Sequence, residues 1–307
     1  MYLFFVIIES MKKPLIIGSV FTEIRNDVDE LPKGNEDFIP KHTEQRVCGS
    51  GYDTAQVLNG FGFPYELIAP VGTGIYGDLV KHECAENHVP LLEKQGINGC
   101  MYTLIDAEGK EGYMCVPGAE YEFDLEDIQY IDPEKISLAA VFGSMLTGEN
   151  ASDLIQALDD LNQPILFIPE NRSEEIDEEI LKEMLALQPQ LFLTDSEAYF
   201  LAGACTNDMK DTADALYKES GAAVMIYQEQ EGIYTEDGKE PTLVPCHRKV
   251  QFNMLAAGYI AAGTAGIARQ NALRYAVHFA EDCGNAMPDS SLFEDEKRQL
   301  AKMILGK

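Results

Sequence analysis

Short apolar segments in the second half of the chain alternate with amphipathic segments of helical length, and this alternation constrains the fold most strongly. The apolar segments are residues 138–144, 164–169, 190–194 and 222–227. The helical segments between them are residues 151–162, 173–188 and 209–221. Buried strands that alternate with helices of this length indicate a mostly parallel sheet with helices on both faces. The sequence therefore predicts an α/β body.

The N-terminal third adds strands to this pattern. Residues 14–20 and 65–71 are each expected to form a buried strand, because both are short apolar runs. Segment 21–47 is polar and rich in Pro, Gly and Asp, which favours edge strands away from the core. Segment 100–116 alternates in polarity around a turn at 106–109, which predicts a hairpin. We expect segments 21–47 and 100–116 to form a small β-strand lid.

The start of the chain is apolar but does not match a secretory signal peptide. It has neither a basic region before the apolar run nor a cleavage site with small residues. No apolar run reaches the roughly 18 residues that span a membrane. We interpret residues 1–13 as a leader, with Met11 as an alternative start, and residues 14–307 as one domain.

Charge and cysteine content narrow the partners and the compartment. The chain has 23 Lys plus Arg against 52 Asp plus Glu, a formal net charge of −29. A nucleic-acid backbone or an anionic membrane would be repelled over most of such a surface. The seven cysteines include no C-x-x-C pair, so neither a disulfide framework nor a zinc knuckle is expected, and scattered thiols favour the cytoplasm. The five histidines show no metal-ligand spacing, and no metal site is predicted.

Two glycine-rich motifs precede predicted helices. GTGIYG at 72–77 fits the G-x-G-x-x-G fingerprint of dinucleotide-binding enzymes, but no acidic residue follows at the required distance. A dinucleotide-dependent α/β enzyme therefore stays open as an alternative to a plain tight turn. CGSGYD at 48–53 would let the backbone of Gly49 and Gly51 approach a ligand, with Asp53 bonding hydroxyl groups. By itself it is equally a tight turn with a capping Asp. No Walker-type P-loop is present.

The segment 251–270 is nearly uncharged and rich in Ala and Gly, over about three turns of helix. Small side chains allow close helix packing, so a buried helix is the simplest interpretation. A helix N-terminus aimed at an anion is the functional alternative.

Taken together, these segments resemble the ribokinase-like carbohydrate kinase (PfkB) family over residues 14–290. VCGSGYDTAQVLNGFG is similar to the family's first signature, a di-glycine loop and helix that holds the sugar, and GSVFTE is similar to its first strand. The resemblance implies a three-layer α/β/α body with a β lid. It also implies substrate-binding roles for four residues: Glu23, Gly49, Gly51 and Asp53. TDSEAYFLAG is similar to the family's N-x-x-E segment, in which Glu197 and Thr194 would organise magnesium and phosphate.

The departures from the family pattern lie in the nucleotide half of the site. The second signature, D-T-T-G-A-G-D-A-F, aligns with residues 251–259. Its Gly-Ala-Gly anion hole has become Met254, Leu255 and Ala256, and its catalytic Asp has become Ala257. The T-x-G nucleotide segment aligns with residues 227–229, where Tyr227 and Glu229 replace Thr and Gly. A general base contributes roughly 10²–10⁴ in rate and an oxyanion-hole donor about 10²–10³, so these losses predict impaired phosphoryl transfer.

The expected function is therefore a catalytically impaired PfkB-like protein that binds a sugar- or nucleoside-like small molecule, with no catalytic residue assigned. The alternative is an active ATP-dependent sugar kinase that uses Mg·ATP and another base, such as Asp53. Without activity, no cofactor is expected. Lids in this family often pair, so the resemblance implies a homodimer formed through the lid.

Overall fold

The structure is a computed structural model that describes residues 12–34, 37, 39–203, 208–229, 231–239, 241–284 and 287–304. A central sheet of eight strands has the order β14-β13-β12-β11-β10-β9-β1-β4. Its six parallel strands are β4 (Glu66–Ile68), β1 (Lys13–Ile17), β9 (Ile136–Phe142), β10 (Ile165–Ile168), β11 (Gln190–Thr194) and β12 (Val224–Gln228). The ribokinase-like α/β architecture expected from the sequence is confirmed.

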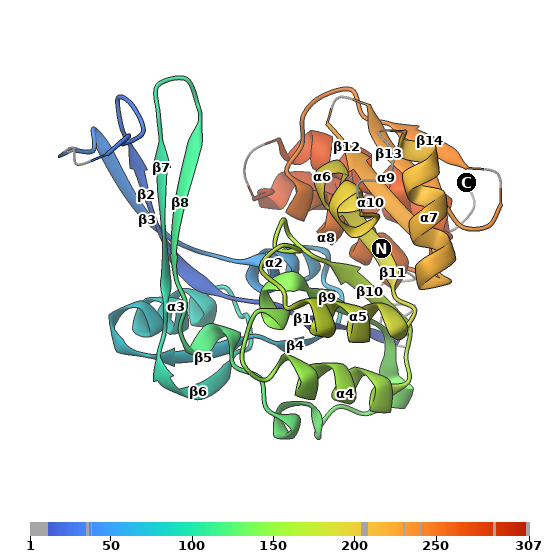
Figure 1. Ribbon diagram of the computed structural model, residues 1–307, viewed down its shortest axis with the longest axis horizontal. Helices are drawn as coiled ribbons and strands as arrows, with labels where there is room; N and C mark the ends of the chain where they lie inside the picture. The colour runs from blue at the N-terminus through green and yellow to red at the C-terminus, as the bar shows by residue number, and fades with distance from the viewer. Residues whose placement is uncertain are drawn as a thin grey trace.

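Helices cover both faces of this sheet (Figure 1). One face packs against α4 (Ala151–Leu161), α5 (Glu178–Ala186), α6 (Asp195–Leu201) and α7 (Met209–Ser220). The other packs against α2 (Ser50–Phe61), α8 (Phe252–Thr264), α9 (Arg269–Cys283) and α10 (Ser290–Ile304). Along β1, Leu15 and Ile17 join the first core while Ile16 joins the second, as the two-residue repeat of a strand requires. Burial on both faces explains why these strands are apolar throughout.

Two parts of the strand prediction were wrong. Residues 65–71 are not one strand: β4 ends at Ile68, and β5 (Pro70–Thr73) leaves the central sheet to pair with β6 (Leu92–Ile97). Beyond β12 the sheet turns antiparallel through β13 (Gly232–Glu236) and β14 (Thr242–Pro245), which the sequence analysis did not predict. Edge strands of mixed polarity lack the continuous apolar run by which the central strands were recognised.

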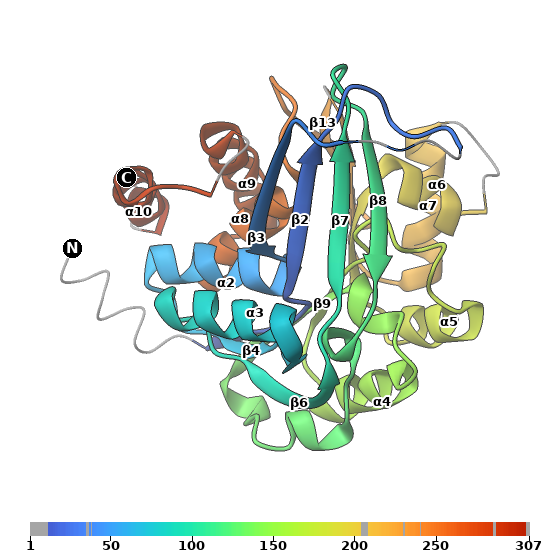
Figure 2. The same ribbon diagram turned by 90° about the vertical axis from the view of Figure 1, so that its left-hand side faces the viewer.

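A second sheet stands apart from the body in Figure 1 and is seen face on in Figure 2. Its order is β3-β2-β7-β8, formed by β2 (Phe21–Asp27), β3 (His42–Cys48), β7 (Cys100–Ile105) and β8 (Glu111–Val116). The hairpin between β7 and β8 is confirmed, and Gly109 takes a φ of 81° in its turn. The pairing of β2 with β7 is parallel and joins the two segments that we expected to form the lid. We call this four-stranded unit the small sheet.

The motif GTGIYG marks a strand-to-helix turn outside the central sheet. It follows β5 and opens α3 (Gly74–Glu86), with Thr73 as N-cap. Because β5 pairs only with β6, this turn does not lie at the carboxyl edge of the central sheet, where a dinucleotide would bind. The dinucleotide-enzyme alternative is therefore overturned.

The uncharged segment forms α8, which is buried on all sides, so the buried-helix interpretation is confirmed. Its residues 254–262 are all buried, and the helix packs against α9 and α2. Within the described part of the chain, no helix is long and apolar enough to cross a membrane. Residues 1–11, most of the leader that the sequence analysis proposed, lie outside the described residues.

Candidate functional site

The N-terminus of α2 lies against the end of β1, and two glycines make this approach possible. Gly51 N donates to Ser19 O at 3.1 Å. A Cβ at Gly51 would lie 2.6 Å from Gly18 O, and one at Gly49 would lie 2.5 Å from Ser19 O. Gly49 also has a φ of 124°, a conformation that other residues rarely adopt. The di-glycine loop is therefore required by the packing of α2 on β1, whatever else it binds.

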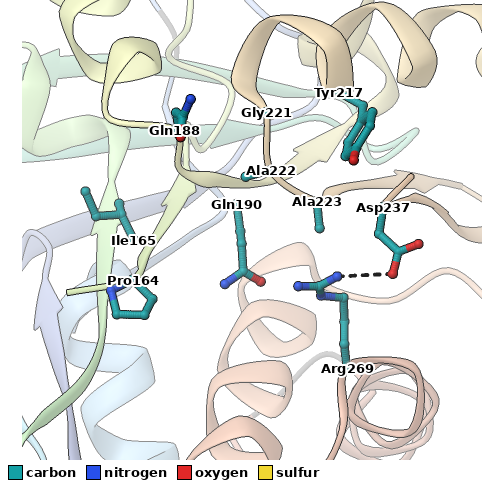
Figure 3. A pocket seen from close by; sticks show the side chains of 10 residues that line it. All are labelled: Pro164, Ile165, Gln188, Gln190, Tyr217, Gly221, Ala222, Ala223, Asp237 and Arg269. Carbon is teal, nitrogen blue, oxygen red and sulfur yellow. Dashed lines mark hydrogen bonds and ion pairs between the residues drawn. The ribbon is translucent and has the colours of Figure 1, made fainter. Parts of the chain in front are cut away.

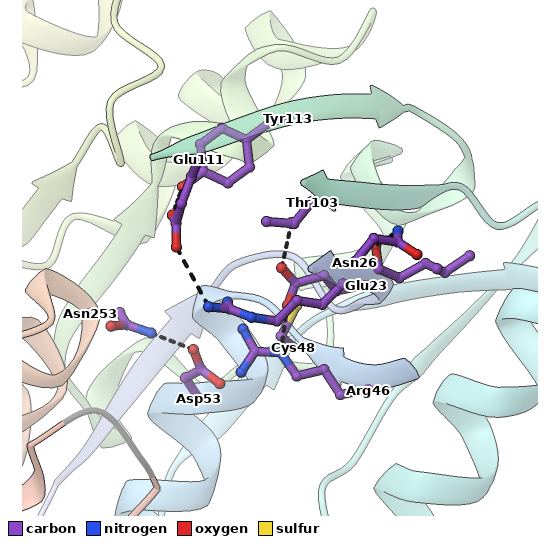
Figure 4. Close-up of polar contacts among 11 residues, drawn as sticks. Glu23, Asn26, Arg46, Cys48, Asp53, Thr103, Glu111, Tyr113 and Asn253 are labelled. Carbon is purple, nitrogen blue, oxygen red and sulfur yellow. Dashed lines mark hydrogen bonds and ion pairs between the residues drawn. The ribbon is translucent and has the colours of Figure 1, made fainter. Parts of the chain in front are cut away.

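Glu23 lies where the small sheet meets the body, and its side chain is 2% exposed (Figure 4). Its Oε1 accepts a 2.5 Å hydrogen bond from Thr103 Oγ1 on β7, and its Oε2 accepts from Arg46 Nε on β3. The Cys48 thiol lies 3.9 Å from the same Oε2. Burial, together with the carboxylates of Asp53 and Glu23, raises the pKa of Cys48 well above its usual value, which keeps it a thiol.

Asp53 lies in the first turn of α2 and accepts a 2.5 Å hydrogen bond at Oδ2 from Asn253 Nδ2 in the first turn of α8. Burial raises the pKa of Asp53 to about 6, although Asn253 and the charge of Arg46 oppose that shift. Asp53 is therefore a carboxyl group that changes protonation near neutral pH.

The sequence analysis missed three side chains that complete this sugar-side cluster. They are Arg46, Thr103 and Asn253. Arg46 lies opposite Glu23 in the register of β2 and β3, whereas Thr103 lies on β7 two residues beyond Met101, the register partner of Glu23, and sequence does not reveal either pairing. Asn253 lay within the aligned second signature but was not singled out. The cluster of Glu23, Arg46, Asp53, Thr103 and Asn253 offers both donors and acceptors, which suits a hydroxyl-rich ligand.

The N-terminus of α8 is apolar, in the segment that aligns with the family's anion hole. Met254 is 2% exposed, and Leu255, Ala256 and Ala257 are fully buried. The Met254 backbone N–H donates to the side-chain Oδ1 of Asn253 at 3.1 Å. No carboxyl group stands at position 257 to accept a proton from a substrate hydroxyl.

Aromatic rings pack beside this helix end. The Phe252 ring lies 5.3 Å from Phe192 and 6.2 Å from Tyr227, measured between centroids. Tyr227 is 7% exposed, and its hydroxyl accepts a hydrogen bond from Val250 N at 3.4 Å. Glu229, in the turn after β12, forms an ion pair of 3.3 Å with Lys249. The segment aligned with the nucleotide motif therefore contributes a buried ring and a carboxylate already paired with a cation.

Glu197 is buried, and protein donors occupy both of its carboxylate oxygens. Asn171 N donates to Oε1 at 2.5 Å, while Thr194 N and Thr194 Oγ1 each donate to Oε2 at 2.8 Å. Glu197 and Thr194 form a capping box at the start of α6. Burial raises the pKa of Glu197. These contacts give both residues a structural role in joining α6 to the turn after β10.

A further carboxyl group, the partly buried Glu170, was not assigned in the sequence analysis. It follows β10 within the segment PENR at 169–172. Glu170 Oε2 accepts a hydrogen bond of 3.0 Å from Ser144 Oγ, which in turn lies 3.2 Å from Ser19 Oγ. Glu170 and Asn171 both have a positive φ, 61° and 60°, which is uncommon for residues other than glycine. Burial raises the pKa of Glu170 to about 7.

A pocket of about 360 Å³ opens at the opposite edge of the central sheet (Figure 3). Ile165, Gln190 and Ala223 line it at the starts of β10, β11 and β12, together with an ion pair of 3.2 Å between Arg269 and Asp237. The sugar-side residues Glu23 and Asp53, by contrast, follow the end of β1 or lie on α2. This pocket therefore does not belong to the candidate site.

The fold and the site define a class: α/β sugar and nucleoside kinases with a small sheet beside the carboxyl edge of the central sheet. The family model described as "pfkB family carbohydrate kinase" matches residues 11–290, so the chain belongs to the PfkB family. No curated protein matches the chain in sequence.

Solved structures share this fold at low identity. Ribokinase from Thermotoga maritima superposes with a TM-score of 0.77 at 16% identity, covering 95% of this chain and 99% of that one. Ribokinase from Arabidopsis thaliana, complexed with ribose and ATP, gives 0.73 at 17%, covering 94% and 99%. The nucleoside kinase from Burkholderia thailandensis, in complex with inosine, gives 0.72 at 15%, covering 94% and 98%.

Proposed function

We propose that this protein binds a sugar- or nucleoside-like ligand beside the small sheet and is impaired in phosphoryl transfer. The observation that carries the proposal is the first turn of α8. Ala257 stands at the position of the family's catalytic Asp, and the preceding residues, Met254, Leu255 and Ala256, are buried. A methyl group cannot take a proton, and these side chains replace the glycines that let phosphate approach backbone N–H groups.

The ligand side supports binding. The carboxylate of Glu23, the guanidinium of Arg46 and the Asp53–Asn253 pair lie between the small sheet and α2, and together they match the mixed donors and acceptors of a polyol. The Arabidopsis ribokinase is described with ribose and the Burkholderia nucleoside kinase with inosine, which supports these two compounds as first ligands to test.

The residues of the nucleotide side do not fit Mg·ATP in the arrangement that the family motifs imply. Both oxygens of Glu197 already accept hydrogen bonds from the protein. Tyr227 and Phe252 bring aromatic rings, and Glu229 brings a negative charge, to the segments aligned with the nucleotide motifs. The carboxylate of Glu229 repels a polyanion, an effect that its ion pair with Lys249 reduces.

An active sugar kinase is the second candidate, and Asp53 is the observation that favours it. Its pKa of about 6 suits a general base near neutral pH. In this case Asp53 would accept the proton of the substrate hydroxyl in place of the family's Asp, and phosphoryl transfer with a loose transition state demands little from a base.

Calorimetric titration with Mg·ATP, ribose and inosine separates the two candidates. The proposal expects heat of binding from ribose or inosine, its loss in Glu23→Gln, and no binding of Mg·ATP at millimolar concentration. Micromolar Mg·ATP binding together with turnover that Asp53→Asn abolishes would establish the active kinase instead. The matched control is Glu108→Gln, an exposed change in the turn between β7 and β8.

A restoring variant tests the same assignment in the opposite direction. Ala257→Asp combined with Met254→Gly, Leu255→Ala and Ala256→Gly rebuilds the family's second signature. We expect it to gain some nucleotide binding and phosphoryl transfer. An unchanged variant would show that Tyr227 and Glu229 also block the nucleotide.

We further propose that the small sheet forms a homodimer through its outer face. Tyr102 on β7 lies opposite Met114 on β8, so these two residues and Val116 share one face. Met114 and Val116 are 56% and 45% exposed, which is costly for apolar side chains in water. Sedimentation should give a dimer that Met114→Lys dissociates, while Leu243→Lys at exposed β14 leaves it intact. A monomeric wild type would refute this arrangement.

A further inference from the structure

A cluster of three metal-ligating side chains lies on α9 and α10, outside the candidate site. His278 and Asp282 are one helical turn apart on α9, and Glu296 reaches them from α10. One ligand atom from each lies within 4.8 Å of the other two. These two helices pack beside one another at the C-terminal end of the chain (Figure 2). The sequence analysis predicted no metal site, because Glu296 is too far along the chain to show a ligand spacing.

Glu296 is the unusual member of the cluster. Its side chain is 2% exposed, and among the described residues no donor lies within hydrogen-bonding geometry of its Oε2, although the buried Tyr275 hydroxyl interacts with the carboxylate. A buried carboxylate with one oxygen incompletely satisfied is costly, and proteins normally pair such groups or use them to coordinate a metal. In the part of the chain that the structure describes, His278 is the one titratable group around Glu296 that can carry a positive charge. The others are Asp282, Asp295, Tyr275 and Cys283. The carboxylate is thus short of a cation.

The distances suit a metal ion held between the three side chains. His278 Nε2 lies 3.5 Å from Glu296 Oε1 and 3.6 Å from Asp282 Oδ2. Two ligands of a tetrahedral zinc ion, each about 2.0–2.2 Å from the metal, lie about 3.4 Å apart. Gln299 Oε1, at 2.8 Å from Nε2, is too close to be a second ligand in its present position. That hydrogen bond would break when Nε2 gives up its proton to bind a metal.

We propose that His278, Asp282 and Glu296 bind a divalent transition-metal ion of the zinc class, which fastens α10 to α9. One imidazole and two carboxylates suit such ions better than Mg²⁺ or Ca²⁺, which prefer oxygen ligands alone. Asp282 is exposed, so the ion can enter from solvent and keep a water ligand. This site is independent of the proposed function, because none of its residues belongs to the sugar-side cluster.

Zinc titration of the chelator-treated full chain tests the proposal by calorimetry and by thermal unfolding. We expect one equivalent of Zn²⁺ to bind and to raise the Tm, since a ligand that binds only the folded state stabilises it. Glu296→Gln should fold well, because it removes a buried charge, but should weaken Zn²⁺ binding by at least about tenfold. Equal Zn²⁺ affinity in wild type and Glu296→Gln overturns the proposal.

The control is His82→Ala. His82 forms a similar pair with Glu86, at 3.6 Å on α3, but both side chains are exposed, and among the described residues they belong to no group of three metal-ligating side chains. It should leave Zn²⁺ binding unchanged, and a loss equal to that of His278→Ala would overturn the assignment.

Two spectroscopic readouts complete the test. The protein with Co²⁺ in place of Zn²⁺ should show no thiolate charge-transfer band. Such a band would show that cysteine thiolates bind the metal and would overturn the proposed ligands. Hydrogen exchange should slow in α10 when Zn²⁺ binds. Unchanged exchange there would reject the fastening of α10.

Discussion

Asn253 donates a 2.5 Å hydrogen bond from Nδ2 to Asp53 Oδ2, and this contact joins the first turns of α2 and α8. The two residues lie 200 positions apart in the chain. Each belongs to a segment that aligns with a family signature, one on the sugar side and one on the nucleotide side. The bond therefore fixes the two halves of the candidate site relative to one another.

The first prediction concerns the protonation of Asp53. Burial raises its pKa from 3.8 to about 6. Because the pKa of Asp53 is higher in the folded state, binding of the proton stabilises the fold. This stabilisation is complete below about pH 4 and is lost as the pH rises through about 6. The difference between the two pKa values corresponds to about 3 kcal/mol. Asp53→Asn keeps an acceptor for Asn253 without the charge, so it should be more stable than wild type at pH 7 by up to that amount, with a smaller difference at pH 4.

Urea unfolding at both pH values checks this prediction. Asp78→Asn, an exposed change on α3, serves as the control and should show no such pH dependence. Equal destabilisation of the variant at pH 4 and pH 7 would show that ionising Asp53 in the folded state does not lower the free energy of unfolding.

The second prediction separates a structural from a metal-organising role for Glu197. Its carboxylate accepts three hydrogen bonds, two from the backbone and one from the Thr194 hydroxyl. Glu197→Ala leaves partly buried donors without partners, at a cost of about 1–3 kcal/mol each when no water replaces the carboxylate, so we expect a loss of about 2 kcal/mol in unfolding free energy. Glu183→Ala on the exposed side of α5 should cost little. Unchanged stability with weakened nucleotide binding would instead favour the magnesium and phosphate role.

The fold was largely predictable because its signal is local. The strands β9 to β12 are continuous apolar runs, and apolar residues recur at helical spacing in the segments between them. This periodicity and the order of the segments were enough to predict the layered architecture. The break at Ala69, between β4 and β5, was not predictable: both strands are apolar, and only their different pairing partners separate them.

The candidate site was predictable only in part. Glu23, Asp53 and Ala257 were found from their motif positions, whereas Arg46 and Thr103 become site residues through strand register between distant segments. Glu170 could have been noticed as an acidic residue directly after a buried strand, but its burial depends on packing against Ser144. Sequence indicates which residue types are present, and tertiary structure decides which of them are desolvated together.

The third prediction concerns the ion pair of Glu23 and Arg46. Arg46→Met removes the one cation that, among the described residues, bonds a carboxylate that is 2% exposed. Breaking a buried pair costs about 3–5 kcal/mol, but Arg46 is 46% exposed, so solvent screening reduces the expected loss to about 1–3 kcal/mol. Glu23→Gln in the same chain should restore part of that loss. A double-mutant cycle in urea measures the coupling, and additive single changes would show that the pair does not stabilise the fold.

The last prediction uses two glycines with opposite surroundings. Gly51→Ala would place a Cβ 2.6 Å from Gly18 O, so α2 must move away from β1, and we expect a loss of about 1–3 kcal/mol. Gly263, on α8, has no atom within 4 Å of the corresponding Cβ position, and Gly263→Ala should gain up to about 1 kcal/mol through helix propensity. Thermal unfolding measures both changes. Gly51 also sets the distance between α2 and the sugar-side cluster, so Gly51→Ala should lose ligand binding while Gly263→Ala retains it. Equal effects of the two substitutions would mean that α2 tolerates displacement. The di-glycine loop would then not set the geometry of the site.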